Sequence, residues 1–208
     1  MFNVQFITHF TDRISYRESA EIALAGGCKW IQLRMKGAED EEVEKTAMEI
    51  MPLCRKAGAT FILDDRVELV RKIGADGVHL GKNDMPIKDA RKILDRNFII
   101  GGTANTIEDI VRINEEGADY IGCGPFRYTE TKAKLAPILG EKSYRELIRQ
   151  MRELKISLPI VGIGGVTADD IPLLHSIGLS GIALSGSILH AQNPEEEMRK
   201  IMKITQNL

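Results

Sequence analysis

Short runs of apolar residues recur along the whole chain and predict buried strands. Each run is four or five residues long and almost continuously apolar, as in Tyr120-Ile121-Gly122-Cys123. Such runs are typical of parallel strands that are covered on both faces. The runs lie at residues 4–8, 30–33, 60–63, 77–80, 98–101, 120–123, 160–163 and 181–184.

Most of the intervals between these runs have helical spacing. In residues 39–56 four apolar residues repeat along one helix face: Val43, Ala47, Ile50 and Cys54. Acidic residues crowd the start of this segment and basic residues its end, which suits the helix dipole. Pro52 is expected to kink or shorten the helix. A glycine followed by an apolar and a polar residue closes several helix patterns and opens the next strand, at 58–60, 74–76, 117–119 and 178–180.

Alternating strands and helices predict an α/β protein, and specifically a (β/α)8 TIM barrel. Eight such units over 208 residues fill residues 1–208 as one domain, because no linker or composition break divides the chain. The alternative is an open doubly wound sheet. No G-x-G-x-x-G follows the first strand to support that alternative.

Composition and charge exclude several classes of partner. The formal net charge of −2 gives no reason to expect nucleic acid or an anionic membrane surface. No apolar run approaches the roughly 20 residues that span a bilayer, and the N-terminus lacks export features. The three cysteines form no C-x-x-C pair and predict buried side chains in a reducing compartment. We expect a cytoplasmic protein with small-molecule substrates, and a homo-oligomer is compatible with the sequence.

Polar and glycine residues gather where the predicted strands end, which is where the sites of such barrels lie. Alternation places Gln32, Arg34 and Lys36 on one side of the chain after the second strand. Glycines end the seventh and eighth strands and favour phosphate binding through backbone N–H groups. The carboxylates of Asp65 and Asp84, beside basic residues that include Lys132, suit a Mg²⁺–diphosphate complex.

Each of these features also has a structural explanation. Asp65 could cap the following helix, and Asp84 could form a turn with Pro86. Gly-Ile-Gly-Gly at 162–165 could be a tight turn, and His79 could be a satisfied core histidine. A barrel would place all of these residues at the same end of its strands, which favours a functional site over separate structural roles.

The motifs together resemble those of the thiamine phosphate synthase family. Their order and approximate spacing agree from about residue 4 to residue 190. They are Gln32-x-Arg34-x-Lys36, Asp64-Asp65-Arg66, Gly77-Val78-His79-Leu80-Gly81 with Asp84, Gly124-Pro125 with Thr129-Glu130-Thr131-Lys132, Gly162-Ile163-Gly164-Gly165, and Leu184-Ser185.

The resemblance implies a Mg²⁺-dependent transferase. It would join 4-amino-5-hydroxymethyl-2-methylpyrimidine diphosphate to 4-methyl-5-(2-phosphooxyethyl)thiazole, giving thiamine monophosphate and diphosphate. It further implies Asp65 and Asp84 as metal ligands, and Arg34, Lys36 and Lys132 as the groups that stabilise the departing diphosphate. The implied substrate-binding residues are Gln32, Arg34, Lys36, Asp64, Thr103, Thr129, Thr131, Lys132, Gly165, Leu184 and Ser185.

Two departures from the family pattern bear on the alternative functions: the absent His counts against one of them, and Asp64 keeps the other open. Asp64 stands where the family commonly has Asn, and Asn105 where it commonly has His. A thiazole tautomerase uses a His that is absent here and lacks the Thr-x-Thr-Lys loop that is present. A catalytically silent relative that binds thiamine phosphates is the other alternative, because an extra carboxylate near diphosphate could weaken anion binding.

Overall fold

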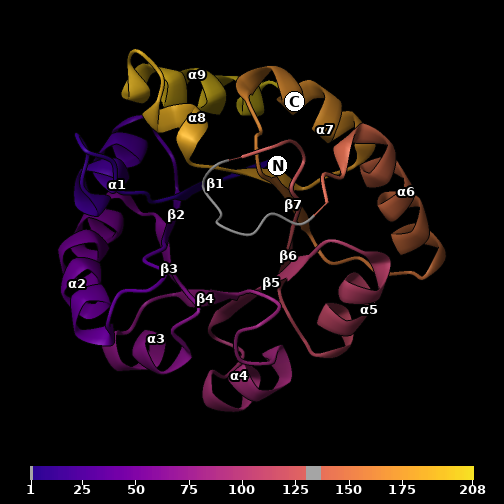
Figure 1. Ribbon diagram of the computed structural model, residues 1–208, viewed down its shortest axis with the longest axis horizontal. Helices are drawn as coiled ribbons and strands as arrows, with labels where there is room; N and C mark the ends of the chain where they lie inside the picture. The colour runs from indigo at the N-terminus through magenta and orange to yellow at the C-terminus, as the bar shows by residue number, and fades with distance from the viewer. Residues whose placement is uncertain (1, 130–136) are drawn as a thin grey trace.

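The chain folds into a closed barrel of parallel strands surrounded by helices (Figure 1). The computed structural model describes residues 2–129 and 137–208. Each strand pairs with its neighbours in the sequence, and the last strand pairs with the first. The strands are β1 (Asn3–Ile7), β2 (Trp30–Leu33), β3 (Thr60–Asp64), β4 (Gly77–Leu80), β5 (Ile99–Ala104), β6 (Tyr120–Cys123), β7 (Ile160–Ile163) and β8 (Gly181–Leu184). The predicted (β/α)8 barrel is confirmed.

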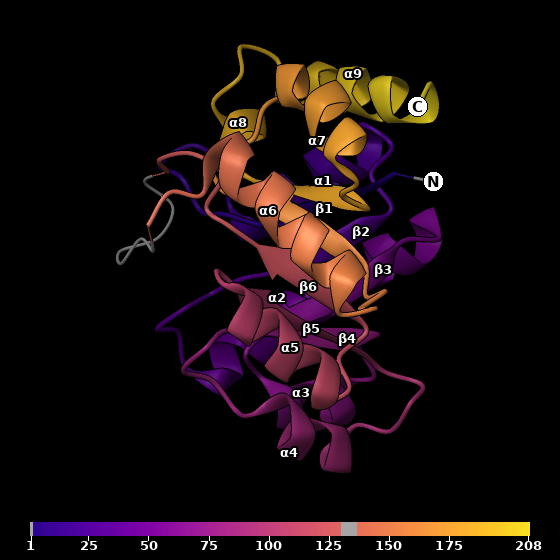
Figure 2. The same cartoon turned by 90° about the vertical axis from the view of Figure 1, so that its right-hand side faces the viewer.

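The helices alternate with the strands and cover the outside of the barrel. They are α1 (Tyr16–Ala25), α2 (Asp40–Ala57), α3 (Val67–Ile73), α4 (Ile87–Ile93), α5 (Ile107–Glu115), α6 (Gly140–Glu153), the 3-10 helix η1 (Ala168–Asp170), α7 (Ile171–Ile177), α8 (Gly186–Leu189) and α9 (Pro194–Gln206). Both chain ends lie at one end of the barrel, and α8, which follows β8, lies at the other (Figure 2). No helix within the described ranges has the length and apolar character needed to cross a bilayer.

The α2 segment follows its predicted pattern closely. All four residues of the predicted stripe are buried, and Pro52 lies on the exposed side of the helix. The helix continues to Ala57, so Pro52 does not end it. Gly58 then adopts the left-handed conformation (φ 62°) and its N–H group bonds to helix carbonyls, as the glycine-containing repeat predicts.

Strand β5 extends further than the predicted run at 98–101. It continues to Ala104 because β6 runs beside it, pairing Thr103 with Gly122 and Ala104 with Cys123. Thr103 therefore lies inside the strand, where pairing with β6 fixes its backbone.

The core has an outer and an inner part. The outer part fills the space between the strands and the helices. The inner part lies within the barrel and consists of Ile7, Ile62, Tyr120, Val161 and Ala183. Polar side chains replace this apolar filling toward the carboxyl ends of the strands.

Candidate active site

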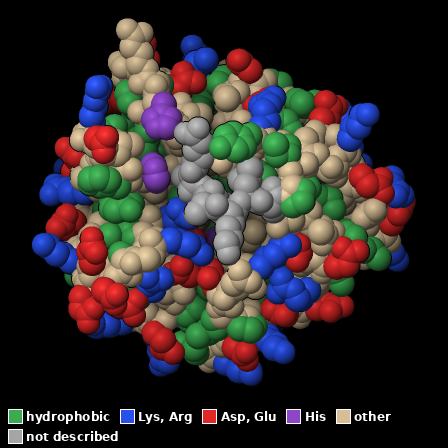
Figure 3. Space-filling view, viewed as in Figure 1, with side chains coloured by type: hydrophobic (Ala, Val, Ile, Leu, Met, Phe, Trp, Pro, Cys, Tyr) green, Lys and Arg blue, Asp and Glu red, His purple; other side chains and the backbone are tan. Residues whose placement is uncertain are grey.

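A cavity of about 540 Å³ lies at the carboxyl ends of the strands, and segments from all eight strands line it. Lys and Arg side chains meet Asp and Glu side chains near the centre of this face of the molecule (Figure 3). The cavity brings together most of the residues that the sequence indicates as substrate-binding: Gln32, Arg34, Lys36, Asp64, Thr103, Thr129, Gly165, Leu184 and Ser185. Thr131 and Lys132 lie outside the described residues.

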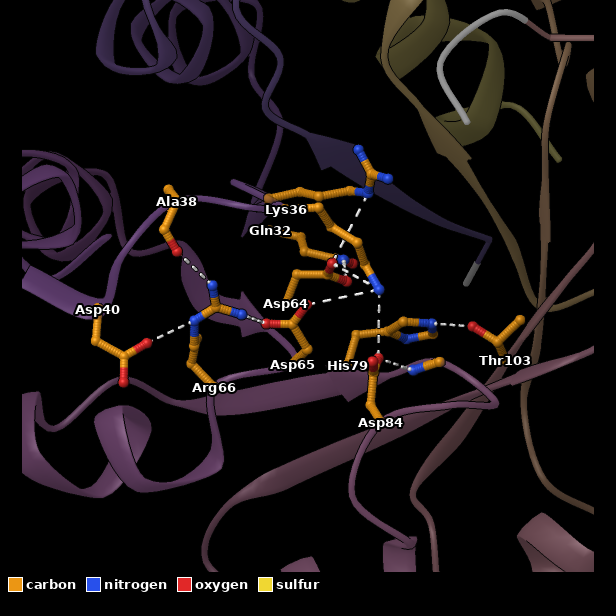
Figure 4. A network of polar contacts seen from close by, with 12 residues as sticks. Gln32, Lys36, Ala38, Asp40, Asp64, Asp65, Arg66, His79, Asp84 and Thr103 are labelled. Carbon is orange, nitrogen blue, oxygen red and sulfur yellow. Dashed lines mark hydrogen bonds and ion pairs between the residues drawn. The ribbon is translucent and has the colours of Figure 1, made fainter. Parts of the chain in front are cut away.

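Lys36 is the centre of a cluster of opposite charges (Figure 4). Its Nζ lies 3.5 Å from Oδ2 of Asp65, 3.5 Å from Oδ2 of Asp84 and 3.9 Å from Oδ2 of Asp64. Asp64 ends β3, whereas Asp65 and Asp84 lie in the segments that follow β3 and β4, which are neighbours in the barrel. Three acidic groups thus face one ammonium group at the edge of the cavity.

Asp65 is held in an unusual backbone conformation. Its φ of 58° lies in the left-handed region, which non-glycine residues adopt mainly where surrounding structure imposes it. The Asp65 N–H group donates to the carbonyl of His79 at 2.9 Å. The Asp65 carboxylate also bonds Arg66, whose guanidinium donates to the Ala38 carbonyl and pairs with Asp40. These contacts turn the Asp65 carboxylate toward Lys36.

Asp64 is a buried acid. Gln32 Nε2 donates a 2.9 Å hydrogen bond to its Oδ1, whereas its buried Oδ2 has no hydrogen-bond partner within the described residues. Burial, together with the neighbouring charge of Asp65, raises the pKa of Asp64 to about 6, although Lys36 and Arg34 act in the opposite direction.

The carboxylates of Asp65 and Asp84 fit a divalent cation. Both turn an oxygen toward the same cationic atom, and carboxylate oxygens are the protein ligands that Mg²⁺ prefers. The described residues contain no group of three or more His, Cys, Asp or Glu side chains arranged to hold a metal. The donor set therefore suits an ion that takes its remaining ligands from water and phosphate oxygens.

The opposite side of the cavity is built from backbone and hydroxyl groups. Gly164 and Gly165 have φ values of 89° and 64°, and a Cβ on Gly165 would lie 2.7 Å from the Tyr128 carbonyl oxygen. The Gly165 N–H group donates to no acceptor in the part of the chain that the structure describes. Ser185 Oγ is buried, also without a hydrogen-bond partner there. An N–H and a hydroxyl group without partners among the described residues suit an anion.

Two further contacts anchor the segment that follows β6. Arg127 Nη2 donates a 2.6 Å bond to Asp170 Oδ1 in η1, and Arg127 Nη1 bonds the other carboxylate oxygen. Asn105 donates from Nδ2 to the Gly124 carbonyl. The residue that stands in place of the family's His thus holds the start of the loop.

Sequence reasoning missed several residues of the cavity wall. Lys82 lines the cavity and pairs with Asp109 at 2.5 Å, and Gln5 lines it from inside β1. His79, for which the sequence also allowed a core role, bonds Tyr120 and Thr103 through its two ring nitrogens and lines the cavity as well. A polar residue inside an apolar strand, such as Gln5, is the signal that could have found this inner set.

Comparisons with known proteins agree on one family. The family model described as "Thiamine monophosphate synthase" matches residues 4–188. "Thiamine-phosphate synthase" of Phocaeicola vulgatus is 58% identical over 201 residues, which are 97% of this chain and 97% of that protein. The protein of the same description from Bacteroides thetaiotaomicron is 56% identical, covering 98% of both chains. Among solved structures, "Thiamine phosphate pyrophosphorylase" from Pyrococcus furiosus superposes with a TM-score of 0.86 at 30% identity, covering 99% of this chain and 96% of that chain.

Proposed function

The chain belongs to the thiamine monophosphate synthase family, a family of transferases, and from this premise we propose the reaction that it catalyses. The ring nitrogen of 4-methyl-5-(2-phosphooxyethyl)thiazole attacks the CH₂ group of 4-amino-5-hydroxymethyl-2-methylpyrimidine diphosphate. The new C–N bond gives thiamine monophosphate, and the C–O bond to diphosphate breaks. The electron pair of that bond leaves with the diphosphate.

The pyrimidine diphosphate binds on the β2–β4 side of the cavity. Gln32, Arg34 and Lys36 extend from one side of β2 and the segment after it, and all line the cavity. Their two cationic groups suit an anionic diphosphate. Thr103, on β5, adds a hydroxyl group to the same wall. Lys132 is proposed to supply a further positive charge to the diphosphate.

Asp65 and Asp84 would hold Mg²⁺ beside the diphosphate. The fit is supported by the two carboxylate oxygens that face the same Lys36 atom. A bound Mg²⁺ supplies positive charge to the leaving group and so lowers the free energy of charge separation. Lys36, which is 3.5 Å from both carboxylates, would contact the diphosphate once those carboxylates hold the cation.

The thiazole phosphate binds on the β7–β8 side. Gly165 and Ser185 offer an N–H and a hydroxyl group without partners among the described residues. Leu184, Thr129 and Thr131 complete this side of the proposed site. The two phosphate sites then bracket the reacting carbon and nitrogen atoms.

No protein nucleophile or general base is required. The thiazole nitrogen is itself the nucleophile, and the aminopyrimidine ring donates electrons to the carbon that loses diphosphate. The chain contributes alignment of the two rings and charge that stabilises the transition state. A dissociative substitution is therefore the mechanism that these residue types support.

The observation that carries the proposal is that Lys36, which lines the cavity together with Arg34, lies 3.5 Å from the carboxylates of both Asp65 and Asp84. The test is formation of thiamine monophosphate from both substrates and Mg²⁺, with each component omitted in turn. Product that requires all three components is expected. Product formed without the thiazole phosphate, or none with the complete mixture, would refute the proposed reaction.

A further inference from the structure

A chain of hydrogen bonds crosses the barrel interior and ends at the cavity. Gln5 Nε2 donates to the Tyr120 hydroxyl at 3.1 Å, and this hydroxyl lies 2.9 Å from His79 Nδ1. His79 Nε2 lies 2.9 Å from Thr103 Oγ1 (Figure 4). The four side chains come from β1, β6, β4 and β5, so the closed barrel is what brings them together.

The chemistry of Gln5 and Tyr120 determines which atom donates and which accepts in every hydrogen bond of this series. An amide nitrogen only donates, so Gln5 occupies a lone pair of the Tyr120 oxygen. Burial raises the pKa of Tyr120, so its hydroxyl keeps one proton to donate. Within the described residues the hydroxyl has one other partner, His79 Nδ1, which must therefore accept.

An imidazole that accepts at Nδ1 carries its proton on Nε2 when it is neutral. His79 Nε2–H then donates to Thr103 Oγ1 and occupies a lone pair there. The Thr103 hydroxyl has no second partner in the described part of the chain, and Thr103 lines the cavity. Its proton is left to point at an acceptor on a bound ligand.

Close packing against the backbone of two glycines holds the Tyr120 and His79 rings in place. A Cβ on Gly101 would lie 2.2 Å from the Tyr120 ring, and a Cβ on Gly122 would lie 2.7 Å from His79 Cε1. Any side chain at either glycine would displace a ring of the hydrogen-bonded chain. The Trp30 and Tyr120 rings also pack edge to face, with their centroids 4.7 Å apart.

We propose that Tyr120 is a positioning residue that holds His79 as the Nε2–H tautomer and thereby directs the Thr103 hydroxyl proton into the cavity. Tyr120 lies at the barrel interior and acts only through His79. The ligand acceptor is an atom of the pyrimidine diphosphate, a part of the inference that rests on the proposed function. The tautomer itself does not depend on that function.

The first test is a proton–nitrogen correlation spectrum of the histidine rings in the ligand-free protein. The His79 signals are identified by their loss in His79→Gln. We expect a neutral His79 with its proton on Nε2, and a population protonated on Nδ1 in Tyr120→Phe. A wild-type proton on Nδ1, or an unchanged tautomer in Tyr120→Phe, would overturn the proposal. Once His79→Gln has identified the signals, the wild-type tautomer decides which atoms donate in this series of hydrogen bonds, even if Tyr120→Phe does not fold.

The second test measures the dissociation constant of the pyrimidine diphosphate for Tyr120→Phe, Thr103→Val and the double variant. Loss of one hydrogen bond predicts weakening of roughly three- to tenfold for each single variant. The double variant should bind no more weakly than Thr103→Val, because Tyr120 acts through Thr103. KM for this substrate should rise more than kcat falls. Additive losses would contradict a positioning role.

The control is Tyr16→Phe, which removes a hydroxyl group that is not part of this series of hydrogen bonds. It should change neither the His79 tautomer nor the affinity for the pyrimidine diphosphate. Absence of turnover by the wild-type protein would refute the proposed function while leaving the spectroscopic result standing. The two ideas can therefore fail separately.

Discussion

Gln32 and Asp64 lie on neighbouring strands of the barrel, and the Gln32 amide donates a 2.9 Å hydrogen bond to the Asp64 carboxylate. The other carboxylate oxygen is buried and lies 3.7 Å from Arg34 Nε. An acid in this setting is ionised at a cost in folding free energy that nearby cations offset only in part. The chain thus carries an additional negative charge where an anionic substrate is proposed to bind.

Asp64→Asn is expected to stabilise the protein at neutral and alkaline pH. The folded-state pKa of about 6 lies above the ordinary value of 3.8, so the folded state holds the proton more tightly. Wild-type stability should therefore fall as the pH rises from about 4 to about 6, and remain lower above that window. Asn keeps the oxygen that accepts from Gln32, and the gain above pH 6 should be at most about 3 kcal/mol.

Chemical unfolding of both proteins between pH 4 and pH 8 checks this prediction. The difference should shrink toward zero near pH 4. Exposed Asp169, which is changed to Asn in the control, should give no pH-dependent difference. A constant difference across the range would contradict a buried, titrating Asp64.

Lys36→Met is expected to make the protein depend on divalent cations for stability. Removing the ammonium group leaves the carboxylates of Asp64, Asp65 and Asp84 without the positive charge that they share. The free energy of unfolding should fall by about 1 kcal/mol without metal, because Lys36 is partly exposed and its pairs are screened. Added Mg²⁺ should restore the loss and bind more tightly than in the wild type.

Titration of each protein with Mg²⁺, followed by calorimetry and by chemical unfolding, measures both effects. Lys200→Met on α9 removes a comparable surface charge and serves as the control. Equal metal affinity in Lys36→Met and the wild type would show that Lys36 does not compete for the carboxylates.

Sequence patterns predicted the barrel because each strand is a short apolar run. The five runs that match the observed strands residue for residue include 77–80 and 181–184. Boundaries failed where the partner strand decided the outcome, since pairing with β6 carries β5 through Thr103 and Ala104. A local pattern contains no information about such a neighbour.

The positions of the candidate site residues could be predicted to a similar extent, and for a related reason. Residues that follow strands, such as Arg34 and Ser185, are found from topology alone because strand ends share one face of a barrel. Arg66 was quoted only as part of a motif, and its bonds to Ala38 and Asp40 depend on the approach of two loops. The inner chain through Gln5 and Tyr120 needs the register of strands far apart in sequence.

Asp170→Asn is expected to destabilise the loop that follows β6. Burial favours the protonated form of Asp170, but bonds from Arg127 and Thr167 outweigh it and hold the pKa below its ordinary value. The contribution to stability should be present above pH 3.8 and lost as the pH falls through the lowered pKa. Loss of these bonds should cost about 1–3 kcal/mol at pH 7.

Thermal and chemical unfolding at pH 7 and in the acid range measure this loss. Glu141→Gln, which breaks an exposed pair with Arg145 on α6, is the matched control and should have little effect. A loss of equal size for both variants, or one independent of pH, would argue against the Arg127–Asp170 link.

Ser185→Ala is expected to raise stability while weakening substrate binding. Ser185 Oγ is buried without a hydrogen-bond partner in the described residues, so its removal should add about 1 kcal/mol to the free energy of unfolding. KM for the thiazole phosphate should rise about tenfold, and KM for the pyrimidine diphosphate should stay near the wild-type value. Steady-state kinetics with each substrate varied in turn separates the two, and a rise in both KM values would place Ser185 elsewhere in the mechanism.

The most direct test of the account is the rate of diphosphate release by the wild type, Asp84→Asn and the exposed control Asp169→Asn. The account predicts release that requires both substrates and Mg²⁺, at the same rate in wild type and control. Asp84→Asn should be at least about a hundredfold slower, and higher Mg²⁺ concentrations should recover part of its rate. Equal rates for Asp84→Asn and the wild type would contradict the metal–diphosphate site at the edge of this cavity.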